Sequence, residues 1–282
     1  MARGKRGQRK LPEDFRKRCR VPNFGKGFKL RDADPGEKSA FPDRPSAEAA
    51  MAEDVVRIDE LQDVMWAQGK HALLAIFQAM DAGGKDGTIR KVFGPTDPLG
   101  VITTSFKKPS ERELAQDYLW RVHQVVPAKG MIGLFNRSHY EDVLIVRVHA
   151  LVPPDRIEQR YDQINAFEKH LAENGVTILK FFLHISKDKQ KERLQDRIND
   201  STKRWKFNPA DLNERKLWKQ YMEAYELALT RCSTPWAPWY VIPANRNWYR
   251  NAMVARIVRS TLEDMDLKYP PALKGIEKTI VE

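Results

Sequence analysis

One short stretch, FQAMDAGGKDGTIRK (residues 77–91), combines the residue types that bind phosphate. An apolar run leads into it, and Gly83, Gly84 and Gly87 let the backbone approach a ligand closely. Lys85 supplies a mobile positive charge, and the helix expected to follow presents free N–H groups at its positive end. These features indicate a loop that binds phosphoryl groups.

The stretch departs from the usual phosphate-loop pattern G-x-x-x-x-G-K-[ST] at two positions. Ala79 replaces the first glycine, where small size suffices, and Asp86 replaces the hydroxyl residue that normally binds Mg²⁺. Thr88 offers partial compensation, but Asp81 is the stronger metal-ligand candidate, because hard cations prefer carboxylate oxygen. The alternative is a glycine-containing turn that binds no ligand.

A second group of polar residues, NRSHYED, follows another apolar run. Asn136 stands where such a strand end normally carries a carboxylate for the metal, and Glu141 and Asp142 come a turn later. Arg137 suits neutralisation of charge on a transferring phosphoryl group. We expect His139 to pack or form hydrogen bonds, and Asp142 to be a solvated or helix-capping charge.

A third segment, residues 185–209, carries eight Lys/Arg against four acidic residues. Arg193 and Arg197 are spaced i, i+4 and therefore share a helix face. The segment reads as a lid that closes over phosphates and excludes water, with a solvated helix face as the alternative. Lys107 extends the row of positive charges along this edge, with an ordinary solvent-exposed loop as the alternative. Arg246 lines a pocket for the nucleotide base, with a helix cap as the alternative.

The elements that must position these residues alternate between strand and helix. Such alternation predicts one parallel sheet covered on both faces, with ligands at the carboxyl ends of the strands. The expected strands are 71–79, 101–106, 131–135, 177–185 and 239–243. The expected helices begin near 46 and 87 and cover 110–126, 154–173, 187–200, 211–232 and 247–265; Ser110 and Glu113 form a capping box.

Composition restricts the class of protein. The net charge of +11 comes mostly from residues 1–30, which hold eleven Lys/Arg against two acidic residues. We expect residues 1–45 to be a basic extension that folds onto the domain only in part. No apolar run is long enough to span a membrane and no secretory signal is expected. Two unpaired cysteines argue against disulfides and zinc and predict a cytoplasmic location.

Four motifs together resemble polyphosphate kinase family 2 between about residues 51 and 265: MDAGGKDGTIR, FNRSHYED, KRWKFNPADL and PWYVIPANRNWYRN. The resemblance implies a three-layer α/β/α, thymidylate-kinase-like P-loop fold over 46–282, with a lid at about 187–209. It implies transfer of phosphoryl groups between inorganic polyphosphate and purine nucleotides, with Mg²⁺ or Mn²⁺. The subgroup resembled, class III, accepts nucleoside mono- and diphosphates, and relatives form homodimers or homotetramers.

The resemblance also assigns roles to particular residues. The implied catalytic residues are Asp81, Lys85, Arg137 and Glu141, with Asp81 and Glu141 as metal ligands. The implied nucleotide-binding residues are Asn136, Arg137, Glu141 and Arg246. The implied phosphate- and polyphosphate-binding residues are Gly83, Gly84, Asp86, Gly87, Thr88, Arg90, Lys107, Arg193, Arg197, Lys203 and Arg204.

The resulting hypothesis is Mg²⁺-dependent transfer from polyphosphate to AMP and ADP, without membrane or specific nucleic-acid partners. Two alternatives remain open at this point. One is an ATP-dependent nucleoside monophosphate kinase on the same fold. The other is a polyanion- or nucleic-acid-binding protein that uses the basic extension.

Overall fold

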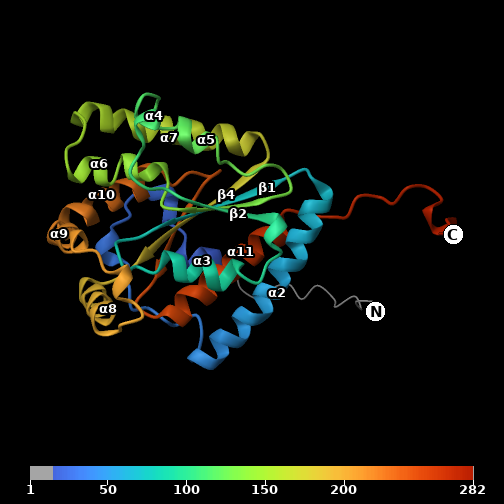
Figure 1. Cartoon of the computed structure of the whole chain (residues 1–282), viewed down its shortest axis with the longest axis horizontal. Coiled ribbons are helices and arrows are strands. Elements are labelled where there is room, and N and C mark those ends of the chain that lie inside the picture. Colours follow the sequence, from blue (N-terminus) through green and yellow to red (C-terminus); the bar gives the residue numbers. More distant parts are fainter. Residues whose placement is uncertain (1–14, 282) are drawn as a thin grey trace.

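A computed structural model describes residues 15–281; the first fourteen residues of the predicted basic extension, and residue 282, lie outside the described part. Within that range the chain forms one sheet of five parallel strands in the order β2-β3-β1-β4-β5 (Figure 1). The strands are β1 (Ala72–Gln78), β2 (Val101–Ser105), β3 (Ile132–Asn136), β4 (Val176–His184) and β5 (Trp239–Pro243). The predicted parallel α/β fold is confirmed.

Strand β1 occupies the centre of the sheet and is buried along its whole length. Its side chains alternate between two cores, as the two-residue repeat of a strand requires. Leu73 and Phe77 belong to the larger core, whereas Leu74 and Ile76 belong to the smaller one. Apolar residues on both faces explain why β1 reads as a continuous hydrophobic run rather than an alternating one.

Helices cover both faces of the sheet (Figure 1). α2, α3 and α11 lie on one side, and α7 lies on the other with the short α4 and α5. The helices are α1 (Phe15–Cys19), α2 (Arg44–Gln68), α3 (Lys85–Phe93), α4 (Glu111–Leu114), α5 (Trp120–His123), α6 (Ile145–Val148), α7 (Pro154–Glu173), α8 (Lys187–Asn199), α9 (Ala210–Lys216), α10 (Trp218–Arg231) and α11 (Asn247–Asp264). Short 3₁₀ turns occur at Pro22–Gly25, Leu30–Asp32, Pro98–Gly100, His139–Asp142, Arg204–Lys206 and Ile276–Lys278.

Two predicted helices are interrupted. The predicted 110–126 helix is two single turns, α4 and α5, although the capping box at Ser110 is present as expected. The Asp117 carboxylate accepts hydrogen bonds from the N–H groups of Leu119 and Trp120, which starts a new turn instead of continuing the old one. The predicted 211–232 helix is divided between α9 and α10 at Leu217.

The described part of the N-terminal segment packs against the domain. Phe15, Cys19, Val21 and Leu30 are all buried in the larger core. The Val21 N–H also donates to the carbonyl of Trp239 on β5, at 2.9 Å. Part of the predicted basic extension therefore contributes side chains to the core of the protein.

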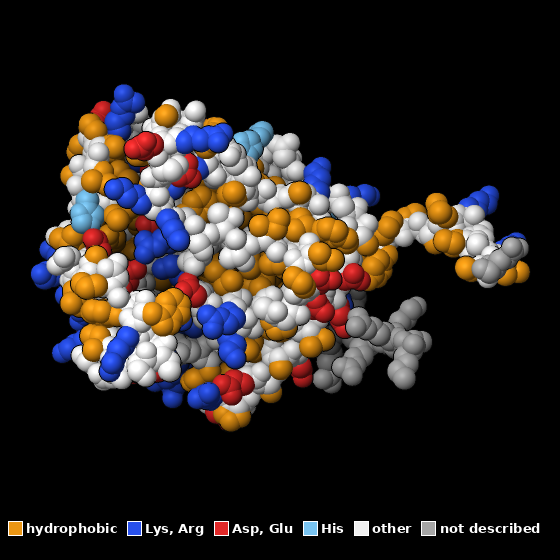
Figure 2. All heavy atoms as spheres, viewed as in Figure 1, with side chains coloured by type: hydrophobic (Ala, Val, Ile, Leu, Met, Phe, Trp, Pro, Cys, Tyr) orange, Lys and Arg blue, Asp and Glu red, His pale blue; other side chains and the backbone are white. Residues whose placement is uncertain are grey.

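Basic side chains are unevenly distributed over the surface. On the face shown in Figure 2, Lys and Arg gather toward the end of the molecule that carries α8 and α9. Hydrophobic side chains are more frequent near the edge strand β2, where Leu99 and Ile102 are exposed. None of the helices in the described range is both long and apolar enough to cross a membrane.

Candidate active site

A cleft of about 680 Å³ opens where β1 and β3 end, between the start of α3, the α8 segment and the start of α11. This is the edge at which parallel α/β sheets bind ligands. Nine Lys/Arg and three Asp line it, a formal excess of six positive charges. These residues are Lys85, Arg90, Lys107, Arg137, Arg193, Arg197, Lys203, Lys206 and Arg250, with Asp81, Asp86 and Asp196. A polyanion is the ligand class that such a lining attracts.

The loop between β1 and α3 has the form expected of a phosphate loop. Gly84 precedes the helix in a left-handed conformation, with φ of +104°. L side chains rarely adopt this φ, and a Cβ atom here would also lie 2.0 Å from Nη1 of Arg250, so the position favours glycine. The first N–H groups of α3 have no partner within the helix, and they lie beside the cleft, where they can bind an anion.

Lys85 is the first residue of α3 and is 8% exposed. Its Nζ donates to the carbonyl oxygen of Ala79 at 3.1 Å, so the side chain folds back over the loop. Burial, followed by the charge of Arg137, lowers the pKa of Lys85 from 10.5 to about 8. The ammonium is therefore mostly charged at neutral pH, and loses its proton more readily than an exposed lysine.

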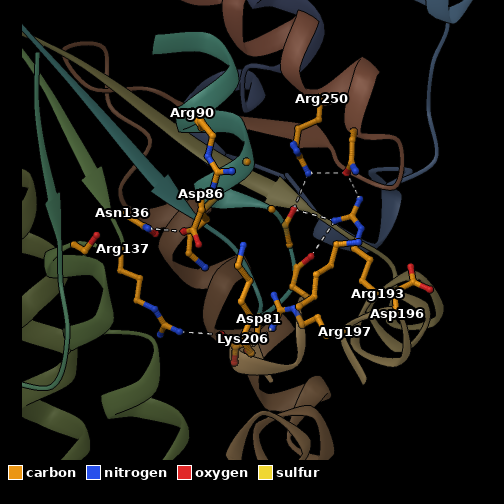
Figure 3. Close-up of a pocket in the computed structure, with 18 of the residues that line it drawn as sticks. Asp81, Asp86, Arg90, Asn136, Arg137, Arg193, Asp196, Arg197, Lys206 and Arg250 are labelled. Carbon is orange, nitrogen blue, oxygen red and sulfur yellow. Dashed lines mark hydrogen bonds and ion pairs between the residues drawn. The ribbon is translucent and has the colours of Figure 1, made fainter. Parts of the chain in front are cut away.

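Arg137 lies between two carboxylates at the end of β3. Its Nη2 is 2.8 Å from Oδ1 of Asp81 (Figure 3). Its Nη1 is 3.2 Å from Oε2 of Glu141. Burial opposes the charged form, but Glu141 and Asp81 together raise the pKa of Arg137. The four predicted catalytic residues, including Lys85, are thus gathered at one place.

Asp86 has a partner that the sequence did not reveal. Nδ2 of Asn136 donates to Oδ1 of Asp86 at 2.7 Å, and both residues line the cleft (Figure 3). The bond joins the first turn of α3 to the end of β3. It places the two unusual residues of the predicted motifs next to each other.

The residues present fit a metal ion shared with substrate. No group of three or more His, Cys, Asp or Glu side chains in the range 15–281 is arranged to hold an ion by itself. Mg²⁺ is commonly bound by one or two carboxylates together with substrate phosphates and water. Both predicted metal ligands are paired with Arg137, but Asp81 lines the cleft and suits that mode, whereas Glu141 does not line it.

The predicted lid residues divide into two groups. Arg197 and Lys203 line the cleft, as does Arg193. Arg193 is occupied, however, because its Nη1 donates to the carbonyls of Ala82 and Gly83 at 3.0 and 3.1 Å. Arg204 does not line the cleft; its Nε donates to the carbonyl of Ile198.

Several other expectations have definite outcomes. Arg90, Lys107, Gly83 and Gly87, which were expected to bind phosphate, line the cleft. Thr88 does not: it is fully buried, and its hydroxyl lies 3.1 Å from the carbonyl of Gly84 and 3.2 Å from Asn251 Oδ1.

Arg246 also lies away from the cleft. It precedes α11 and donates to the carbonyl of Gly36, so the helix-end alternative describes its position better than a base pocket. His139 is buried and bonded to Glu168, as predicted. Asp142 is not solvated, because Arg160 lies 3.1 Å from its carboxylate and also binds its carbonyl oxygen.

Arg250 is the main cleft residue that sequence reasoning missed. It is 2% exposed, and its Nη1 donates to the carbonyl of Gly83 at 3.2 Å, directly behind the phosphate loop (Figure 3). Burial, and the nearby charge of Arg193, lower the pKa of Arg250, which remains a cation at neutral pH. The available signal was the arginine in the motif NRNWYRN, one turn into the helix after the last strand.

Comparison with known proteins places this geometry in a family. The family model for polyphosphate kinase 2 (PPK2) matches residues 42–270. The AMP/ADP-polyphosphate phosphotransferase of Meiothermus ruber is 53% identical over 94% of this chain and all of its own length. The ADP-polyphosphate phosphotransferase of Rhodopseudomonas palustris is 42% identical, over 81% of this chain and 83% of its own. The crystal structure of polyphosphate kinase 2 from Arthrobacter aurescens TC1 superposes with a TM-score of 0.91 at 41% identity, covering 95% of this chain and 96% of that one. The chain belongs to the polyphosphate kinase 2 family.

Proposed function

We propose that this protein transfers phosphoryl groups from inorganic polyphosphate to AMP and ADP, with Mg²⁺ or Mn²⁺. Family membership and the names of the similar proteins support the reaction. The similar Meiothermus ruber protein is named for both AMP and ADP, which supports acceptance of both nucleotides here.

The observation that carries the proposal is the charge of the cleft. Nine cations against three carboxylates exceed what a single small phosphate group requires. Arg193 and Arg250 are held by loop carbonyls, and the cations that remain suit a polymer with about one charge per phosphate. Lys203 and Lys206 lie on the segment after α8, away from the phosphate loop in sequence but on the same cleft. They provide a place for phosphates beyond the reacting one.

The chemistry requires little more than positioning and charge neutralisation. An oxygen of the acceptor's terminal phosphate attacks the end phosphorus of the polymer. The bond to the next phosphate breaks, and the shortened polymer leaves with the electron pair on its oxygen. The attacking oxygen is already ionised at neutral pH, so no strong general base is needed.

The residues of the cleft have separate parts in this reaction. Lys85 and Arg137 neutralise the charge that spreads over the transferring phosphoryl group, and the N–H groups at the start of α3 bind its oxygens. Mg²⁺ held by Asp81 and substrate phosphates would supply further neutralisation. Arg197, Lys203 and Lys206 exclude water when the lid segment closes.

A donor assay tests the proposal. The full chain is incubated with AMP, Mg²⁺ and long-chain polyphosphate, with no ATP present. We expect ADP to form first and ATP afterwards. Formation of ADP only when ATP is supplied as donor would identify a nucleoside monophosphate kinase instead, and no transfer from either donor would reject both enzymes.

A further inference from the structure

A fully buried polar cluster lies directly behind the loop that carries Arg137 and Glu141. It consists of His139, Tyr140, Glu168 and Lys180, none of which has any solvent exposure. His139 and Tyr140 belong to the loop after β3, Glu168 to α7, and Lys180 to the middle of β4. None of these residues lines the cleft.

The cluster is closely bonded and balanced in charge. Nζ of Lys180 lies 2.6 Å from Oε2 of Glu168, 2.7 Å from the Tyr140 hydroxyl and 2.6 Å from the carbonyl of Cys232. The Tyr140 hydroxyl donates to Oε1 of Glu168 at 2.9 Å, and Nε2 of His139 is 3.3 Å from the same oxygen. Burial alone would raise the pKa of Glu168, but Lys180 and His139 lower it, so the carboxylate is ionised.

Burying an ion pair of this kind lowers the stability of the fold unless the pair also fixes a particular conformation. Taking two charges out of water costs several kcal/mol, and a well-packed apolar replacement is often equally stable. The ring of Tyr140 also packs edge-on against Trp239, with ring centroids 4.7 Å apart. What the polar bonds add is a fixed position for His139 and Tyr140.

That position matters because Arg137 is strained. Its φ is +63°, a left-handed conformation that costs a non-glycine residue free energy and persists only where the surroundings enforce it. The Arg137 N–H donates to the carbonyl of Phe77, which fixes one side of the residue to β1. The buried cluster fixes the residues immediately after it.

A second attachment holds the far end of the same loop. Nη1 of Arg160, on α7, donates to both the carbonyl and the carboxylate of Asp142, at 2.9 and 3.1 Å. The loop is thus held from behind at His139 and Tyr140 and again at Asp142. Arg137 lies between β3 and the first attachment, Glu141 lies between Tyr140 and Asp142, and the two are bonded to each other.

We propose that Lys180 and Glu168 are positioning residues for phosphoryl transfer, which hold the strained loop so that Arg137 and Glu141 keep their places beside Asp81. The inference rests on the proposed function, because it assumes that Arg137 acts on the transferring group. It assigns a part in the reaction to a lysine inside an apolar strand and to a carboxylate on α7, both remote from substrate.

The test is a double-mutant cycle on the full chain. Lys180→Met should lower kcat for ADP formation from AMP and polyphosphate by about tenfold or more, with affinity for polyphosphate of defined length changed less than about threefold. In an Arg137→Ala background the same change should cost less than about threefold, because the residue through which Lys180 acts is already gone. A purely structural role predicts equal factors in both backgrounds and would overturn the proposal.

Two further variants keep the test decisive. Arg256→Met breaks another buried ion pair, that with Asp54 between α2 and α11, and should lower thermal stability without changing kcat per folded molecule. Tyr140→Phe keeps the ring and removes only the hydroxyl, so it replaces Lys180→Met if that variant does not fold. An unchanged kcat for Tyr140→Phe and Lys180→Met would reject the positioning role; absence of transfer by the wild-type protein would reject the proposed function itself.

Discussion

Asn136 donates a hydrogen bond to Asp86 across 2.7 Å, and this bond joins the end of β3 to the first turn of α3. Each residue departs from the pattern usual for its motif, and the two departures are partners. The amide at position 136 can donate to a carboxylate at position 86, whereas a carboxylate there would repel it. We expect this pair to hold the phosphate loop against the Arg137 loop.

Substitutions of Asp86 should separate its charge from its hydrogen bond. Asp86→Asn keeps a carbonyl acceptor for Asn136 and removes a negative charge from the cleft, so the KM for polyphosphate should fall while kcat changes little. Asp86→Ala removes both, and kcat should fall by about tenfold. Steady-state kinetics distinguish the two, with Asp97→Ala, remote from the cleft, as the control. Equal kcat values for the Asn and Ala variants would show that the bond has no part in turnover.

Gly84 should be far less tolerant of substitution than Gly87, although both line the cleft. A Cβ atom added at Gly84 would lie 2.0 Å from Arg250, and the alanine backbone would have to keep the strained φ of +104°. A Cβ atom added at Gly87 would lie 3.6 Å from its nearest neighbour. Gly84→Ala should therefore lower kcat/KM for polyphosphate by at least about tenfold, and Gly87→Ala by less than about threefold. Comparable losses in both variants would contradict the packing of Arg250 behind the loop.

The pH profile of kcat/KM should report the pKa of Lys85. In the free protein that pKa is about 8, so kcat/KM for polyphosphate should fall above pH 8 as the ammonium loses its proton. This fall is not unfolding, because the unfolded lysine keeps its proton up to about 10.5 and the group therefore adds stability as pH rises from 8 to 10.5. Lys85→Arg should remove the alkaline fall, since a guanidinium stays charged. A profile with the same fall in that variant would assign the ionisation to another group.

Removal of residues 1–30 should destabilise the whole protein. The deletion takes Phe15, Cys19, Val21 and Leu30 out of the core, and burial of a Phe, Val or Leu side chain contributes about 1.5–3 kcal/mol. We expect the melting temperature to fall by about 10 °C or more, measured by calorimetry. Deletion of residues 271–282 is the control, because residues 271–281 are largely exposed. An unchanged melting temperature after the first deletion would contradict the packing of this segment.

The strand order along the chain and the meeting of the polar loops at one edge were predictable from sequence. Buried strands read as uninterrupted apolar runs, and parallel strands bring their carboxyl ends together. These two rules are enough to bring Lys85, Arg137 and the start of the lid segment to one edge of the sheet, where the cleft lies. The glycines indicated the turn, and Gly84 does adopt a positive φ there, which glycine tolerates without strain.

Side-chain partners distant in sequence were not predictable. Arg193 lines the cleft where it was expected to bind phosphate, but its bonds to loop carbonyls more than a hundred residues away could not be read from spacing. Arg250 was not singled out from the sequence, and its close approach to Gly84 brings together residues 166 positions apart. The Thr88 hydroxyl bonds to the carbonyl of Gly84 and to Asn251, and these partners could not be read from sequence spacing.

The central claim is that polyphosphate donates its phosphoryl group in the cleft around Lys85. The most direct measurement is a single-turnover experiment, monitored by ³¹P NMR, with AMP, Mg²⁺ and polyphosphate of defined length, for the wild-type protein and for Lys85→Met. We predict that the wild type converts AMP to ADP while the polymer shortens by one phosphate, and that Lys85→Met forms no ADP although it remains folded. Formation of ADP by Lys85→Met at the wild-type rate, or an unshortened polymer beside newly formed ADP, would contradict the account.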